Sequence, residues 1–288
     1  MKDANAAPKE RAAGKDGGFR SKEPPAANGA GKVSRNYSPP PPPPGKEVLV
    51  KVRGVDKVFS KGGETVYALH DINLDVYRGE YLSIMGPSGS GKSTLFNMVG
   101  ALDVPTAGEV SVGGVSLPTL ASSNLSYFRC KHIGYVFQSY NLIPWLTAIG
   151  NVMLPLTFLG VDEEKARARA KHVLELVGLG HRLDHVPGEC SGGQQQRIAV
   201  ARALANDPAI ILADEPTANL DQKTGQEIIE LMKELCVSEG VTVITATHDF
   251  KMLKASDRIV WIKGGRVDKV EDVANLDIVV GGVDERYE

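Results

Sequence analysis

One loop constrains the fold of this chain more than any other feature, and its sequence is Gly86-Pro87-Ser88-Gly89-Ser90-Gly91-Lys92-Ser93-Thr94. It fits the pattern G-x-x-x-x-G-K-[ST], in which glycines allow successive backbone N–H groups to point at an anion. The segment Glu80–Met85 predicts a strand entering the loop. Leu95–Val99 predicts a helix leaving it, whose positive N-terminal end favours phosphate. Lys92 can reach the β- and γ-phosphates, and the Ser93 hydroxyl can ligate Mg²⁺. The loop therefore predicts a site for ATP or GTP.

Charge and cysteine content narrow the class of protein. The formal net charge is −2, so the chain has no general attraction to nucleic acid, and we expect no nucleic-acid partner. The cysteines Cys130, Cys190 and Cys236 are odd in number and widely spaced, which is typical of free thiols in a reducing compartment. The longest apolar run, near Leu146–Val161, is too short and too interrupted to span a bilayer. If the protein works at a membrane, another chain must supply the span.

Residues 1–46 differ from the rest in composition. They hold nine of the seventeen prolines, including the run Pro39–Pro44, and almost nothing apolar that could be buried. We expect this segment to be disordered, with the proline run as extended polyproline II. It could serve as a spacer, a tether, a proline-rich ligand or a basic arm on anionic lipid. Residues 47–270 should form the globular domain, with a helical insertion at about 135–206, and residues 271–288 a C-terminal tail.

The order of periodic segments predicts an α/β P-loop core with an antiparallel β subdomain and a helical subdomain. Short strands before and after the loop should hold the base, and these are Val48–Val55, Val58–Ser60, Val66–Leu69, Ile72–Val76 and Glu109–Val112. The apolar runs typical of strands covered on both faces are Ala209–Ala213 and Val241–Ala246. Further strands are expected at Ile133–Phe137, Ile259–Ile262 and Arg266–Val270, and helices at Asn151–Leu159, Glu163–Val177, after Ser191, and at Gly225–Val237.

Two carboxylates follow the apolar strand Ala209–Ala213. Because ligands of parallel α/β sheets bind at the carboxyl ends of the strands, Asp214 is placed to hold Mg²⁺ through water. Glu215 lies one residue further and can polarise a water that attacks in line with the γ-phosphate. Taken alone, the pair could also be an ordinary acidic helix start. Beside a phosphate loop, the catalytic interpretation is favoured.

A second anion-binding helix start is predicted at Ser191-Gly192-Gly193-Gln194. Small residues and a free hydroxyl precede a long helix there. One protomer does not need two phosphate cradles, but a two-fold dimer does, because the loop of one chain then faces this motif in the other. The sequence therefore predicts a homodimer with nucleotide at its interface.

Together these motifs resemble the ATP-binding subunits of ABC transporters, and the resemblance runs from about Glu47 to Val270. By the family pattern, Gly86–Thr94 is the Walker A loop, Ala209–Glu215 the Walker B strand and Ser191–Gln194 the signature motif. Cys190 stands where the signature usually has Leu. Further segments look like the ATPases of lipoprotein-release and macrolide-export systems, and these are Val66–Leu69, Gly134–Gln138, Asn141–Pro144 and Ala201–Leu204. That group commonly has a Glu at the place of Gly150, a departure that concerns docking to the membrane partner.

The resemblance implies roles for four further residues. Gln138 falls at the glutamine loop, which senses Mg²⁺ and the membrane partner, and Asp221 belongs to the D-loop. His248 falls at the switch histidine that contacts the γ-phosphate, and Phe59 falls where an aromatic ring stacks on adenine. Gln138 and Lys92 are thus expected to complete the catalytic site with His248 and Glu215.

The resemblance also implies the reaction and its setting. The reaction is ATP hydrolysis to ADP and phosphate, with ATP and Mg²⁺ as cofactors. The partners are a second ATPase subunit and integral membrane permease subunits, on the cytoplasmic face of the cell membrane. The apolar segment Trp145–Leu159 is either an ordinary subdomain core or a groove for a short helix of the membrane partner.

Two rival classes remain open at this point. A soluble ABC ATPase of translation or DNA repair usually carries two cassettes per chain or a long coiled-coil insertion, and this chain has one cassette with neither. An ATP-regulated scaffold protein should have lost Glu215 or the signature, and both are present.

Overall fold

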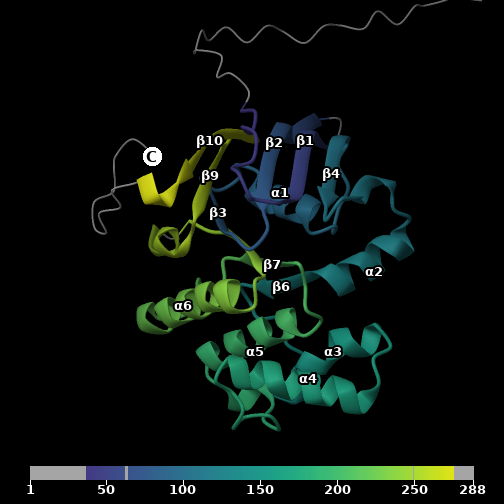
Figure 1. Ribbon diagram of the computed structural model, residues 1–288, viewed down its shortest axis with the longest axis vertical. Coiled ribbons are helices and arrows are strands. Elements are labelled where there is room, and N and C mark those ends of the chain that lie inside the picture. The colour runs from purple at the N-terminus through teal and green to yellow at the C-terminus, as the bar shows by residue number, and fades with distance from the viewer. Residues whose placement is uncertain (1–36, 62–63, 249, 276–288) are drawn as a thin grey trace, which may run out of the picture. The chain divides into compact units, whose positions relative to one another are not determined.

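Two sheets form the framework of the protein (Figure 1). The computed structural model describes residues 37–61, 64–248 and 250–275, so the sequence predictions for 1–36 and 276–288 lie outside the described residues. The first sheet is antiparallel, with strand order β2-β1-β4-β5. Its strands are β1 (Val48–Lys61), β2 (Glu64–Tyr77), β4 (Ala107–Val112) and β5 (Val115–Ser116).

β1 and β2 form one long ribbon, where the sequence predicted several short strands. The pairing register shifts between Val52 and Val55 and again between Val55 and Lys57. The Asp56 carboxylate accepts a hydrogen bond from the Asp71 N–H at 2.8 Å and so bridges the irregular part of the ribbon. The interruptions in hydrophobic alternation are therefore bulges, which bend a strand without ending it.

The second sheet has strand order β10-β9-β3-β8-β7-β6. Five of its strands run parallel, and these are β9 (Arg258–Lys263), β3 (Tyr81–Met85), β8 (Thr242–Ala246), β7 (Ile210–Asp214) and β6 (Ile133–Phe137). The edge strand β10 (Arg266–Asp272) pairs antiparallel with β9. Every residue of β3 and β8 is buried, as expected for strands covered on both faces.

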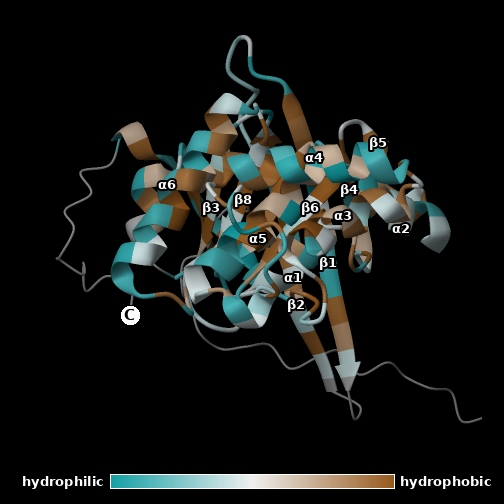
Figure 2. Ribbon diagram, turned by 90° about the horizontal axis from the view of Figure 1, so that it is seen from below, coloured by the Kyte–Doolittle hydropathy of each residue, from teal (hydrophilic) through white to brown (hydrophobic). Residues whose placement is uncertain are grey.

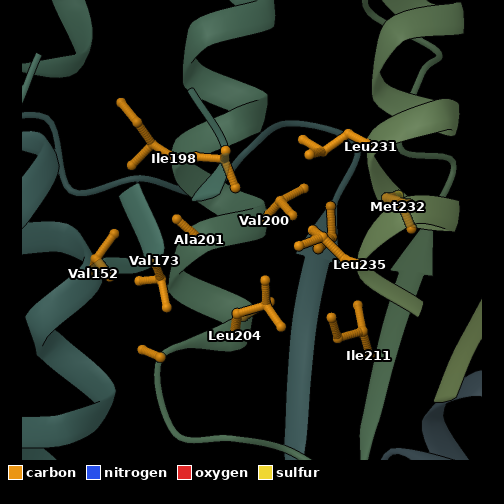
Figure 3. Close-up of a cluster of buried hydrophobic side chains, with 14 of the residues drawn as sticks. Val152, Val173, Ile198, Val200, Ala201, Leu204, Ile211, Leu231, Met232 and Leu235 are labelled. Atoms are coloured by element: carbon orange, nitrogen blue, oxygen red, sulfur yellow. The ribbon is translucent and has the colours of Figure 1, made fainter. Parts of the chain in front are cut away.

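Side chains that alternate along β7 and its neighbours enter two separate cores. Leu212 faces the core that contains α1 (Lys92–Val99) and the first sheet, with α2 (Ser122–His132) at its margin. Ile211 faces the core built by α3 (Ala148–Phe158), α4 (Glu163–Leu176), α5 (Gly192–Leu204) and α6 (Gln222–Ser238), shown in Figure 3. α1 and α5 therefore lie on opposite faces of the second sheet. Figure 2 shows these mainly hydrophobic strands behind helices whose outer surfaces carry many hydrophilic residues.

Short 3₁₀ turns occur at Leu117–Thr119, Pro187–Glu189, Phe250–Ala255 and Val273–Asn275. α2 was not predicted, because its sequence is largely polar and only Leu125 and Phe128 are buried. α3 begins three residues before the predicted start, since the Thr147 side chain caps it by accepting a hydrogen bond from the Gly150 N–H at 3.2 Å. Among the described residues, no helix combines the length and the apolar character needed to cross a bilayer.

The segment before β1 is fastened to the first core. Tyr37 packs against that core as a half-buried residue, although the sequence predicted disorder up to residue 46. Burial raises the pKa of Tyr37, which nearby Arg258 lowers. The Arg258 guanidinium lies 4.3 Å from the Tyr77 ring centroid and 2.7 Å from the Glu80 carboxylate. Tyr37 therefore lies beside a cluster of aromatic and paired charged groups while its ring packs against the first core, and this anchors the segment before β1.

Candidate nucleotide-binding and catalytic site

One row of residues across the second sheet assembles the predicted site. Ile84 of β3 lies opposite Ala246 of β8. Ala246 lies opposite Asp214 of β7, which in turn lies opposite Phe137 of β6. Each strand ends within a residue of this row. The segments that leave the sheet at this edge therefore carry the phosphate loop, His248, Glu215 and Gln138. Carboxyl ends of adjacent parallel strands are where α/β proteins bind ligands.

The loop Gly86–Thr94 lies tightly against the β9–β10 hairpin. Gly86 has a φ of 155°, and a Cβ there would lie 2.2 Å from the Ile262 carbonyl oxygen, so a side chain does not fit. The Gly265 N–H donates to the Ser90 carbonyl at 2.9 Å and fixes the loop from the other side. The Ser90 hydroxyl is buried and has no hydrogen-bond partner among the described residues. An unpaired buried hydroxyl in a phosphate-type loop is consistent with a bound polar ligand.

Positive charge gathers at the start of α1. Gly91 occupies the cap position with a φ of 108°, and no side chain in the described part of the chain caps the first turn. The first-turn N–H groups are thus left for an anion. The Lys92 ammonium donates to the Gly86 and Pro87 carbonyls at 2.7 and 3.0 Å. Partial burial lowers the pKa of Lys92, and the carboxylates of Glu215 and Asp214 act in the opposite direction.

The two carboxylates at the end of β7 have different environments. Burial and the neighbouring Glu215 raise the pKa of Asp214, an effect that Lys92 opposes. Glu215 has a φ of 44°, a left-handed conformation that costs a non-glycine residue about 1 kcal/mol or more. Its N–H donates to the Ala246 carbonyl at 2.9 Å, which holds this conformation. The Glu215 carboxylate lies 2.9 Å from Nδ1 of His248.

Gln138 begins the loop that follows β6, and its side chain is exposed. Its carbonyl accepts a hydrogen bond from the Asn219 side chain at 3.0 Å, which joins this loop to the segment after Glu215. Two and three residues further on, Tyr140 and Asn141 have left-handed φ angles of 60° and 49°. Arg202 of α5 donates to both of their carbonyls, at 2.8 and 2.5 Å. Arg202 lies in the family-like segment Ala201–Leu204 and Asn219 lies just before Asp221, but the sequence predicted a contact for neither of them.

The motif Ser191–Gln194 forms the start of α5. The Ser191 hydroxyl accepts from the Gln194 N–H at 3.3 Å, while the Gln194 side chain accepts from the Ser191 N–H at 3.0 Å. This reciprocal capping box leaves Ser191 exposed at the helix end. A Cβ at Gly193 would lie 2.4 Å from the Thr224 methyl group, so glycine is needed where α5 passes α6. Since α5 and α1 lie on opposite faces of the second sheet, the motif and the phosphate loop lie apart within the chain.

Asp221 and Phe59 lie outside the row that assembles the catalytic residues. The Asp221 carboxylate accepts from the Lys223 and Thr224 N–H groups at 3.1 Å and caps α6. The Thr224 side-chain and backbone hydrogen bonds lower the pKa of Asp221. Phe59 lies on β1 opposite Val66, and it is 46% exposed. No group of three or more His, Cys, Asp or Glu side chains in the described ranges could hold a metal ion.

Comparison with known proteins identifies similar chains. The family model described as ABC transporter matches residues 69–218. The lipoprotein-releasing system ATP-binding protein LolD of Shewanella sp. (strain MR-4) is 42% identical over 80% of this chain and 99% of that protein. The macrolide export ATP-binding/permease protein MacB of Shewanella sp. (strain W3-18-1) is 45% identical over 75% of this chain, a match that covers 33% of MacB.

A solved structure agrees with the fold and with the predicted assembly. It is a dimeric post-hydrolysis state of the ATP-binding cassette MJ0796 from Methanocaldococcus jannaschii, bound to ADP and Pi. It is 46% identical, with a TM-score of 0.72, over 78% of this chain and 99% of that one. The similarity therefore extends over almost the whole length of that protein.

Proposed function

The chain belongs to the family of ABC transporter ATP-binding proteins, and on that premise we propose how its residues carry out ATP hydrolysis and how the reaction serves transport. The family resemblance and the fold class predicted from the sequence are confirmed, and the protein is an ATPase subunit of an ABC transporter. The alternative of a soluble ATPase in translation or DNA repair finds no support in these comparisons. The observation that carries the proposal is the shared strand edge, where Lys92, Asp214, Glu215 and His248 come together.

The residues of the loop fit a triphosphate with Mg²⁺. The uncapped start of α1, the Lys92 ammonium and the unpaired Ser90 hydroxyl all offer hydrogen-bond donors to phosphate oxygens. Ser93, Asp214 and Gln138 would hold Mg²⁺. An ion held there would neutralise charge on the phosphates. The raised pKa of Asp214 means that its negative charge is poorly compensated by the protein alone, which favours a cation beside it.

Glu215 is the residue that orients water. Its carboxylate accepts a hydrogen bond from water and directs the water oxygen at the γ-phosphorus. The bond between that phosphorus and the β–γ bridging oxygen breaks, so that ADP and phosphate are formed from ATP and water. His248 holds the carboxylate through the 2.9 Å contact and lies at the same edge as Lys92, where it can also meet the γ-phosphate.

The second half of each site comes from another copy of the chain. The exposed start of α5, with Ser191 at its cap, offers a second set of N–H donors for a phosphate. Ser191–Gln194 and Gly86–Thr94 lie apart within one chain, so a head-to-tail pair would bring the two halves together. The dimeric state of the similar cassette bound to ADP and Pi supports this arrangement. Asp221, which caps α6 beside Gly193, would lie near the same interface.

A groove on the helical side fits the membrane partner. It has a volume of about 300 Å³ and a mainly apolar lining that includes Phe137, Asn141, Leu154, Pro155, Phe158 and Arg202. Phe158 is 78% exposed, and so is Trp145, which precedes α3 in the chain. A short amphipathic helix of a permease subunit could bury these rings. We place the chain as a peripheral subunit on the cytoplasmic face of the cell membrane, coupled to export or extraction of a substrate.

Two measurements test this function. Phosphate release per chain should require Mg²⁺ and should rise with chain concentration over the range where light scattering detects monomers, because two copies complete each site. A specific activity that stays constant in fully monomeric protein would contradict the shared site. The chain purified from solubilised membranes should retain a membrane protein, and Phe158→Asp should release that protein without abolishing phosphate release. Retention by Phe158→Asp would argue against the groove.

A further inference from the structure

We infer that Lys57 is a positioning residue for nucleotide binding. It connects the Phe59 ring to the C-terminal end of α1 and so fixes the place of the base relative to the phosphate loop. The inference rests on the proposed stacking of Phe59 on adenine. It adds a second residue of β1 to the predicted site, beside Phe59.

The first link is between Lys57 and the ring. The Lys57 ammonium lies 5.2 Å from the Phe59 ring centroid, within the range of a cation–π contact. The Lys57 side chain is only 12% exposed, whereas Phe59 is 46% exposed. The cation therefore occupies one side of the ring and leaves ring surface in solvent. An aromatic ring held in this way is a ready platform for a planar base.

The second link is between Lys57 and α1. The ammonium donates to the Asp103 carboxylate at 2.7 Å and to the Val104 carbonyl at 2.9 Å. The Asp103 N–H in turn donates to the Asn97 carbonyl in the last turn of α1, at 3.2 Å. The first turn of that same helix carries Lys92 and Ser93. Asp103, which holds the Lys57 ammonium, and the phosphate-binding groups therefore lie at opposite ends of one rigid helix.

Neighbouring contacts hold the same two segments together. The Val58 N–H donates to the Thr106 hydroxyl at 3.0 Å, and the Thr106 N–H donates to the Asp56 carbonyl at 2.8 Å. Three consecutive residues of β1 are therefore attached to the segment 103–106. The hydrogen bonds of Asp56 and Val58 fix the position of β1. The contact with Lys57 fixes the position of the Phe59 ring.

This arrangement predicts an effect that depends on the base. Lys57 acts through the ring, so removing its charge should weaken ligands that carry adenine and leave bare phosphates unaffected. The Phe59 ring is 46% exposed, and cation–π contacts at exposed rings are weak, so the expected change is about two- to fivefold in affinity. A general loss of folding or of charge would weaken both kinds of ligand.

Calorimetric titration of the full chain with ADP and with inorganic pyrophosphate separates these cases. Lys57→Met should raise the Kd for ADP about two- to fivefold and leave the Kd for pyrophosphate unchanged. Lys57→Arg, which keeps the cation, should restore ADP affinity. Lys51→Met is the matched control, because it removes an exposed lysine from the same strand, and it should change neither Kd. An equal loss for both ligands, or no loss for ADP, would overturn the inference.

A spectroscopic measurement tests whether Lys57 controls the position of the ring relative to the bound base. In a Phe59→Trp background, ADP should quench the added indole emission, and Lys57→Met should reduce the quenching at saturating ADP. Full quenching in the double variant with Phe59→Trp and Lys57→Met would also overturn the role of Lys57. Phe59→Ala separates the inference from its premise. If Phe59→Ala binds ADP normally, the proposed stacking is wrong. If Phe59→Ala weakens ADP and Lys57→Met weakens it further by the same factor in that background, Lys57 does not act through the ring.

Discussion

Nδ1 of His248 lies 2.9 Å from Oε1 of Glu215, a contact between residues that follow two neighbouring strands of the second sheet. The Glu215 side chain is 26% exposed and that of His248 is 71% exposed. The carboxylate is therefore partly enclosed, while the imidazole remains open towards solvent. This pair lies beside the phosphate loop and provides the basis for the first prediction.

Glu215→Gln should bind ATP with nearly wild-type affinity and lose about 10²- to 10⁴-fold in turnover, because the amide cannot accept a proton from water. Phosphate release and equilibrium ATP binding check the two parts. Unhydrolysed ATP should also hold the two copies together, so the variant should elute as a dimer in ATP and as a monomer in ADP. Turnover at the wild-type rate would remove Glu215 from the assigned role.

Ser191→Arg should abolish hydrolysis and leave nucleotide binding by the monomer intact, because Ser191 serves the site of the other copy. A mixing experiment makes the prediction sharper. Lys92→Ala loses the phosphate lysine, yet a mixed pair of Lys92→Ala and Ser191→Arg chains contains one site with both wild-type halves. Mixing the two inactive variants should therefore restore phosphate release to about a quarter of the wild-type value, since half of the pairs are mixed and each has one intact site. A mixture that stays inactive would argue against the shared site.

Asp214→Asn should stabilise the nucleotide-free protein near pH 7 while removing its activity. The folded protein raises the pKa of Asp214, so it holds the proton more tightly than the unfolded chain does. Stability is therefore lost as the pH rises from the unfolded value of about 3.9 through the raised folded value. The neutral amide avoids this loss. Urea midpoints between pH 4 and pH 7 measure the gain, which should shrink towards pH 4; an identical gain at both ends would contradict the assignment to Asp214.

Tyr37→Ala should lower the free energy of unfolding by about 1 kcal/mol, since a half-buried aromatic side chain loses part of its apolar burial. Tyr37→Phe is the control, because it keeps the ring that packs against the core and should unfold at nearly the wild-type urea concentration. Urea denaturation checks both variants. Equal stability of Tyr37→Ala and the wild type would mean that the ring contributes nothing to the fold.

Local patterns were sufficient for the strands of the second sheet, the phosphate loop and most helices. The apolar run before Asp214 predicts a strand, because such a run suits burial on both faces of a sheet. The glycines around Lys92 predict a phosphate loop, because a side chain would prevent the close backbone approach. The helix α2 shows the limit of such patterns. Only Leu125 and Phe128 of that helix are buried, so its periodicity is too weak to be recognised.

The structure shows which of the predicted site residues are in contact with one another. The sequence identified Glu215 and His248 as separate motifs, and nothing in their spacing indicates a 2.9 Å contact. That contact depends on the order of β7 and β8 in the sheet and on the left-handed conformation of Glu215, both of which are decided by long-range packing. The connection from Phe59 through Lys57 to Asp103 is of the same kind, since its partners are 46 residues apart in the chain.

The sequence by itself therefore determined the family, the α/β core and the identity of the phosphate loop, because these follow from residue types at fixed short spacings. The tertiary structure decided which side chains touch. It joined Glu215 to His248, attached the loop after Gln138 to α5 through Arg202, and fastened Tyr37 to the first core. The physical reason is that each of these contacts links segments whose distance is set by sheet order and core packing, and such distances are not encoded in any one stretch of the chain.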